Sequence, residues 1–140
     1  MTVFTWSAGD GTSTADWTGP ANWDQGASYP QAGDTAIFPA EKHKCYVNAA
    51  SECATLTVAG DAADTVLELQ AALTITGDLT ITSGIVDTGA DHALTVTGNV
   101  LNYGTLTLNG SAFSAAFFRN YSSGVVPAST GQHTFTDALR

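Results

Sequence analysis

The chain has 140 residues, the size of one ordinary domain, and its 21 Thr, 22 Ala and 14 Gly favour β-sheet over helix. Thirteen acidic residues against four basic ones give a net charge of −9, which argues against a surface for nucleic acid or for an anionic membrane. No apolar run approaches the ~20 residues that span a bilayer, so we expect a soluble protein with no membrane partner.

The first forty residues form a segment of their own, with all three Trp, three of the four Pro and a cluster of Gly. We expect short strands at 2–6 and 35–38, with mostly loop at 9–33. A stack of strands exposes an apolar cross-section at its end, which must be covered. The three Trp rings are large enough to plug such an end, so residues 1–40 are predicted to form a Trp-rich cap.

Two cysteines, Cys45 and Cys53, lie eight residues apart and fit no spacing of zinc ligands. Two small buried apolar side chains are the simplest interpretation, and a disulfide between them stays open. The sequence predicts no metal and no cofactor.

A hexad of the form Leu-Thr-apolar-x-Gly-polar recurs in the middle of the chain. Apolar residues alternate with Thr within each copy, which is the period-2 pattern of a strand with one buried face. Gly followed by Asp or Asn then ends the strand, because Gly supplies a positive φ without steric cost. The closest copies begin at Leu56, Leu73 and Leu94, and looser ones begin at Leu79 and Leu106.

These hexads belong to a longer repeat. Residues 73–89, LTITGDLTITSGIVDTG, match residues 94–110, LTVTGNVLNYGTLTLNG, at an offset of 21 apart from one-residue adjustments in the middle. An antiparallel meander has no reason to restore a pattern at such intervals, whereas a β-helix places equivalent residues above one another. We therefore expect one all-β domain, a short parallel β-helix (β-solenoid) with its repeats at 41–110. A β-sandwich or jelly roll is the alternative.

The alternation also predicts which side chains lie inside. Burying each of them stabilises the fold by roughly 1.5 to 3 kcal/mol before chain entropy is subtracted. Residues 61–64 and 88–92 are expected to be surface loops. The predicted core consists of Val47, Leu56, Val58, Leu67, Leu69, Leu73, Ile75, Leu79, Ile81, Ile85, Leu94, Val96, Val100, Leu106 and Leu108.

Between the core positions, outward-facing side chains are predicted to form rows. Thr residues, together with Asn99, Asn102 and Asn109, could form ladders of stacked side chains. No charged residue occurs from residue 93 to residue 116. Flat faces with so little charge are suited to packing against another protein.

Residues 111–140 break the repeat and form an aromatic C-terminal tail. Four aromatic residues lie within nine positions around a lone Arg, which is more than one helix face needs. Residues 112–118 could form a helical turn. We expect the aromatic residues to cap the second end of the stack or to meet another subunit. The predicted protein interface consists of Val3, Phe4, Phe113, Phe117, Phe118, Arg119 and Tyr121.

The opening segment carries the series W-x-x-G…W…NW…P-x-x-GD-x-A-x-F. Its residues are Trp6, Gly9, Trp17, Asn22, Trp23, Pro30, Gly33, Asp34, Ala36 and Phe38. Over about residues 4–39 it resembles the first coil of bacterial surface and autotransporter-like β-helix proteins and of some phage virion proteins. That resemblance implies a cap or first coil and brings no catalytic residue with it.

A short acidic β-protein without a secretory signal is similar to the small decoration or cement proteins that bind the outside of tailed-phage capsids. The resemblance implies a non-enzymatic virion structural protein, made in the host cytoplasm, that binds the major capsid protein and stabilises the shell. It also implies a homotrimer.

A carbohydrate-binding or adhesive surface module is the alternative function, because exposed Trp rings stack on sugars. A small polysaccharide lyase or hydrolase is a third class, with Asp78, Asp87 and Asp91 on neighbouring corners. A small solenoid scarcely forms the cleft that such an enzyme needs, so we expect no enzyme activity. The predicted glycan contacts are Trp6, Trp17, Asn22 and Trp23.

Overall fold

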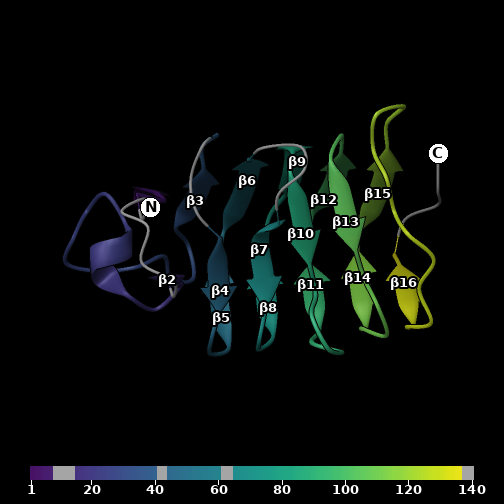
Figure 1. Ribbon diagram of the computed structural model, residues 1–140, viewed down its shortest axis with the longest axis horizontal. Helices are drawn as coiled ribbons and strands as arrows, with labels where there is room; N and C mark the ends of the chain where they lie inside the picture. The colour runs from purple at the N-terminus through teal and green to yellow at the C-terminus, as the bar shows by residue number, and fades with distance from the viewer. Residues whose placement is uncertain (8–14, 41–43, 61–64, 137–140) are drawn as a thin grey trace.

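Short parallel strands wind into a β-solenoid of about four turns in the computed structural model (Figure 1). The structure describes residues 1–7, 15–40, 44–60 and 65–136, the side chain of Thr65 excepted. Each full turn contributes one strand to each of three sheets, so neighbouring strands in a sheet come from successive turns. Within these ranges, the single 3-10 turn η1 (Pro20–Asn22) is the only helix.

Strand pairing confirms the solenoid and excludes the sandwich or jelly roll, whose neighbouring strands are antiparallel. Every pair of neighbouring strands among the described residues is parallel. Sheet I has the order β1 (Val3–Thr5), β3 (Thr35–Phe38), β6 (Thr55–Ala59), β9 (Leu79–Ser83), β12 (Asn99–Asn102), β15 (Phe117–Asn120). Sheet II has the order β2 (Ala15–Asp16), β4 (Cys45–Val47), β7 (Thr65–Leu69), β10 (Ile85–Asp87), β13 (Thr105–Thr107). Sheet III has the order β5 (Ser51–Cys53), β8 (Leu73–Ile75), β11 (Leu94–Val96), β14 (Phe113–Ala115), β16 (His133–Phe135).

The predicted offset of 21 is the length of the turn from β8 to β11. Leu73 pairs with Leu94 across sheet III, 21 positions later. In sheet II, Val86 pairs with Leu106, 20 positions later, which is the predicted one-residue adjustment. The hexads, however, do not all stack on one another. The copy at Leu56 lies in sheet I and pairs with Leu79, because the same local pattern builds strands of different sheets.

The core follows the predicted alternation at every position but one. Val86 is fully buried, whereas Ile85, predicted to point inward, is only partly buried. Gly84 adopts a φ of 83° just before β10, and the pairing of β10 with β7 shifts register between Ile85 and Val86. The corner therefore reverses which residue of the pair faces the core.

Two polar residues that the sequence pattern predicted to be on the surface, Thr88 and Asn102, are buried. Thr88 belongs to the predicted surface loop 88–92 but is buried, and its Oγ1 accepts a 2.7 Å hydrogen bond from Ser111. Asn102 is also buried, and its Nδ2 donates a 2.7 Å hydrogen bond to Asn120. Buried polar groups are tolerated here because they pair from one turn to the next. The predicted loop 61–64 lies outside the described residues.

The first forty residues supply both strands and a plug. Strands β1 and β3 form within the predicted segments 2–6 and 35–38, and β1 is the first strand of sheet I. Trp6 and Trp23 form an isolated antiparallel bridge beside these strands. The segment is therefore a partial first turn whose aromatic side chains fill the end of the stack.

The aromatic tail continues the solenoid instead of leaving it. Phe113 pairs with Leu94 and Phe118 pairs with Val100, so aromatic rings take the places that aliphatic side chains hold one turn earlier. Residues 113–115 and 117–120 are strands, so the helical turn considered for 112–118 is wrong. The sequence repeat ends at 110, but sheets I and III continue to residues 120 and 135, and sheet II continues as the isolated parallel bridge of Val125 to Thr105.

The inward position of Val86 can be tested against its neighbour. We expect Val86→Thr to lower the free energy of unfolding by about 2 kcal/mol, because its hydroxyl would be buried among apolar side chains. Ile85→Thr should cost less than about 1 kcal/mol, because that side chain is partly in water. Urea unfolding followed by circular dichroism measures both losses, and equal losses would contradict the register shift.

Candidate functional site

The Trp cluster fills the N-terminal end of the stack. Trp6, Trp17 and Trp23 are 0–1% exposed, and Trp23 packs edge-on against the other two at centroid distances of 5.0 and 5.1 Å. Trp23 Nε1 donates a 2.8 Å hydrogen bond to the Trp17 carbonyl. Asn22 is half-buried and donates to the Asp16 carbonyl. None of the three rings offers a face on which a sugar could stack.

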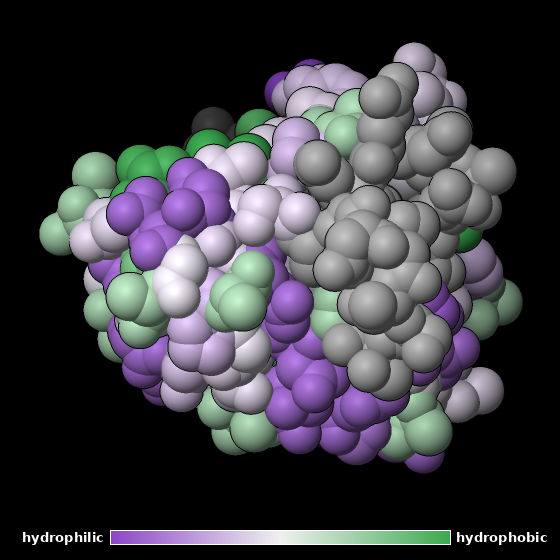
Figure 2. All heavy atoms as spheres, turned by 60° about the vertical axis from the view of Figure 1, so that its left-hand side comes forward, coloured by the Kyte–Doolittle hydropathy of each residue, from purple (hydrophilic) through white to green (hydrophobic). Residues whose placement is uncertain are grey.

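The surface over this end is mixed in character. Figure 2 brings the N-terminal end forward and shows hydrophilic and hydrophobic residues interspersed over its coloured surface. Phe38 lies beneath the cluster, 5.3 Å from the Trp6 ring and 5.4 Å from the Trp23 ring. The indoles therefore act on the core side, as a plug.

The seven predicted interface residues do not form one surface. Phe4 and Phe113 are buried, at 4% and 2% exposure. Val3 is 45% exposed but lies on β1, at the opposite edge of sheet I from β15. Phe118 faces the core, with ring centroids 5.9 Å from Phe113 and 6.0 Å from Phe135. The remaining three residues, Phe117, Arg119 and Tyr121, point outward on the last turn.

Those three residues form a patch together with two residues of the preceding turn. The Tyr103 and Tyr121 rings are stacked, 3.9 Å apart with an interplanar angle of 9°. The Arg119 guanidinium lies 4.8 Å from the Tyr121 ring centre, a cation–π contact. A hydrogen bond with Tyr121 raises the pKa of Tyr103 above its usual value. This aromatic–arginine patch consists of Leu101, Tyr103, Phe117, Arg119 and Tyr121.

Charge sets the patch apart from the other described parts of the chain. Lys44 and Arg119 are the Lys and Arg residues within the described part of the chain. Lys44 forms a 2.8 Å ion pair with Glu68, whereas Arg119 has no carboxylate partner among the described residues. An exposed, unpaired cation beside aromatic rings is typical of a binding surface.

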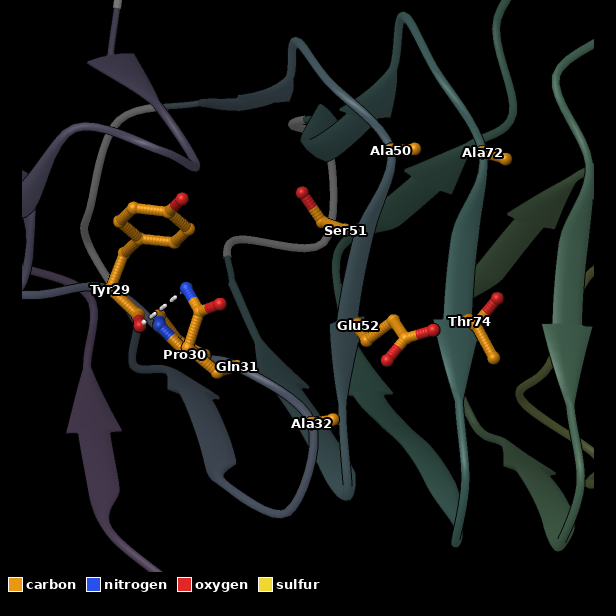
Figure 3. Close-up of a pocket in the computed structure, with 9 residues that line it drawn as sticks. All are labelled: Tyr29, Pro30, Gln31, Ala32, Ala50, Ser51, Glu52, Ala72 and Thr74. Atoms are coloured by element: carbon orange, nitrogen blue, oxygen red, sulfur yellow. Dashed lines mark hydrogen bonds between the residues drawn. The ribbon is translucent and has the colours of Figure 1, made fainter.

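A groove lies near the N-terminal end of the solenoid, beside β5, the first strand of sheet III. It has a volume of about 390 Å³ and separates segment 29–32 from β5 and β8 (Figure 3). Glu52 is exposed, and its side chain extends toward Thr74. Within segment 29–32, Gln31 Nε2 donates to the Tyr29 carbonyl. Its lining residues are Tyr29, Pro30, Gln31, Ala32, Ala50, Ser51, Glu52, Ala72 and Thr74.

The carboxylates considered for a glycosidase have structural partners. Asp78 Oδ1 accepts a 2.7 Å hydrogen bond from the Asn99 backbone. Asp87 Oδ1 accepts hydrogen bonds from the Gly89 backbone and from Asn109 Nδ2, both 2.8 Å long. Asp91 is exposed at a corner. The hydrogen bonds of Asp78 and Asp87 hold corners in place, and neither carboxylate lines the groove.

Other candidate chemistry within the described residues is sparse. No group of three or more His, Cys, Asp or Glu residues there could hold a metal ion. Ser129 Oγ lies 3.1 Å from His133 Nε2, a pair that sequence reasoning missed. The Ser129 hydroxyl also donates to the Asn109 carbonyl, and its oxygen accepts a hydrogen bond from the Gly131 backbone, so it belongs to the hydrogen bonds of this corner. None of the described helices is long and apolar enough to cross a bilayer.

The two cysteines are free thiols inside the stack. Burial, with a smaller effect of Asp34, raises the pKa of Cys53 to about 12. Burial, with a smaller effect of Asp16, also raises the pKa of Cys45 well above its ordinary value. The small-apolar interpretation of both residues therefore holds, and no disulfide joins them.

Sequence reasoning missed Tyr103 and the groove. Tyr103 carried a signal, because it lies one turn before Tyr121 and follows a strand in the same way. The groove has no signal in the sequence. It exists because the partial first turn contributes no strand to sheet III, and no single stretch of sequence shows that a strand is missing.

The buried thiols predict a loss of stability at high pH. Unfolded thiols ionise near pH 9 while the folded ones stay protonated, so ionisation favours the unfolded state as the pH rises from about 9 toward 12. Each thiol should contribute a slope of up to about 1.4 kcal/mol per pH unit. A Cys45→Ala/Cys53→Ala variant should lose this part of the slope in urea unfolding. Parallel curves for both proteins would refute the burial of the thiols.

Burial of the indoles predicts their fluorescence. We expect a blue-shifted native emission that iodide quenches weakly, and strong quenching once the chain is unfolded in urea. Soluble oligosaccharides should leave the native emission unchanged, because the rings have no exposed face. Free tryptophan amide is the reference for full exposure, and native quenching close to that reference would show that the cluster is open.

Comparison with protein-family models, curated proteins and solved structures finds no match to this chain. What the chain does must therefore be inferred from its own surfaces.

Proposed function

We propose that this chain is a non-enzymatic structural protein that decorates and stabilises a larger protein shell, with the outside of a phage capsid as the shell. The observation that carries the proposal is the aromatic–arginine patch on the last turn. Its stacked tyrosines, half-buried Phe117 and Arg119, which has no carboxylate partner among the described residues, are the residue types that anchor protein interfaces.

The remaining surface of the solenoid favours the same use. The outer row of sheet III reads Glu52, Thr74, Thr95, Ser114 and Thr134 from strand to strand. Small, mostly uncharged side chains of this kind can lie flat against another protein. No comparable feature supports the glycan-binding alternative, since the Trp rings are buried.

Decoration would stabilise a shell by mass action. A protein that binds only the assembled, expanded shell favours it by an amount that grows with the free concentration over the dissociation constant. A homotrimer would contact several copies of the major capsid protein at once, and linked contacts multiply the effect. Synthesis in the host cytoplasm and final location on the virion follow from this role.

The two adjacent phenylalanines of β15 allow the proposed interface and the core to be tested separately, because Phe117 points outward and Phe118 points inward. We expect Phe117→Ser, combined with Arg119→Ala, to abolish self-association and binding to undecorated expanded phage heads, with the circular-dichroism spectrum unchanged. Phe118→Ser should instead lower the free energy of unfolding by about 3 kcal/mol, because that ring packs inward. Light scattering and co-sedimentation measure association, and urea unfolding measures stability.

Thr57→Ser, on the same outer face but nearer the N-terminal end, is the matched control and should behave as the unmodified chain. A solution mass near three times 14.4 kDa would support the trimer. Retained association in the Phe117/Arg119 variant would exclude the patch as the interface. A monomer that fails to bind any expanded head would refute the decoration function itself.

A further inference from the structure

We propose that the groove beside β5 binds an extended peptide, which adds as a strand to sheet III and places a basic side chain against Glu52. The site is separate from the aromatic–arginine patch. The patch lies on the last turn of sheet I, and the groove lies at the first strand of sheet III. The proposal therefore stands whether or not the chain decorates a shell.

Sheet III lacks a strand that the other two sheets possess. The partial first turn supplies β1 to sheet I and β2 to sheet II, but sheet III begins one turn later, at β5. The chain between β2 and β3 passes the vacant position as the non-strand segment 29–32, which lines the groove opposite β5. The groove thus lies between this non-strand segment and β5, along the edge of sheet III (Figure 3).

The backbone of β5 faces this vacancy with unpaired groups. Ser51 N donates to Ala72 O, and Cys53 O accepts from Thr76 N, so both residues bond toward β8. In a parallel ladder, the residue between them points its N–H and C=O to the opposite side. That residue is Glu52, and no hydrogen bond joins its backbone to a described residue on the groove side. An extended peptide would supply the missing partners.

The opening has a defined length. Just beyond β5, Ala54 N donates a 2.6 Å hydrogen bond to Asp34 O, so the preceding turn closes onto the edge there. The open stretch is therefore residues 50–52. At about 3.3 Å per residue, it fits a few residues of a longer extended chain. Small side chains at Ala50, Ala72 and Thr74 leave room above the sheet.

Charge indicates which peptide fits. Glu52 is exposed on the outer face and has no cationic partner among the residues that line the groove. A side chain directly opposite it on an added strand would lie within contact distance, where opposite charges attract. In a chain of net charge −9, a Lys or Arg at that position is favoured over an acidic residue.

The test uses a short acetylated and amidated peptide of alternating Val and Thr with one central Lys. Titration into the full-length, ¹⁵N-labelled protein should shift the Glu52 amide resonance and its neighbours in β5. The same amide should exchange rapidly with solvent in the free protein and become protected when the peptide is bound. A peptide with N-methylated backbone on either side of the Lys should bind at least about fivefold more weakly, because it loses edge hydrogen bonds.

Charge reversal supplies the matched controls. Glu52→Gln should weaken binding of the Lys peptide by about two- to fivefold. Glu52→Lys should reject that peptide and bind a peptide with a central Glu instead. Glu52 is an exposed edge residue, so both variants should keep the urea midpoint of the unmodified chain.

Each remaining result would overturn the proposal. Equal binding of the N-methylated peptide would show that no strand is added. Shifts confined to the aromatic–arginine patch would place the peptide elsewhere. A neutral cello-oligosaccharide that shifts the same β5 amides more strongly than the peptide would identify the groove as a glycan site. Absence of any shift at millimolar peptide would show that the edge is closed in solution.

Discussion

In-register parallel pairing between successive turns is the constraint on which this structure depends. Each residue of a strand must lie against its counterpart one turn away, so most inward-facing positions of the wall repeat an apolar residue from turn to turn. The inner row of sheet I illustrates this, with Leu56, Leu79 and Val100 stacked in succession between the smaller Ala36 and the larger Phe118. Main-chain groups of the inner strands thereby pair with the turns on both sides, whereas the strands at the ends of the winding have a neighbour on one side alone.

Function is therefore expected at the two ends of the winding, where the repeat is interrupted. At the last turn, Arg119 faces Leu101 in the outer row of sheet I, at a position where the middle turns have Thr57 and Thr80. At the first turn, sheet III has no strand beside Glu52. One interruption adds charge and aromatic area to a face, and the other leaves hydrogen-bonding groups without partners. Both make a surface that the regular middle turns lack.

Periodicity predicted the strands and the length of one turn, since alternation and offset are properties of the sequence alone. It did not predict which sheet each strand joins, because Leu56 and Leu73 share one local pattern in different sheets. It also failed at Ile85, where the positive φ of Gly84 shifts the alternation. At Phe113, a change of residue type was taken for the end of the fold. Tertiary stacking accepts any apolar side chain of suitable volume, so the winding continues where the sequence repeat stops.

The buried Asn102 connects the core to the patch. It stands where the preceding turn has Ile81, and its Nδ2 donates to Asn120 Oδ1 and to the Val125 carbonyl. Asn120 Nδ2 in turn donates to the Gly124 carbonyl. These bonds fix the path of the corner that carries Tyr121, which an aliphatic side chain at position 102 could not do. A polar pair in the last turns thus positions the outer aromatic rings, at the cost of leaving Asn102 Oδ1 without a partner among the described residues.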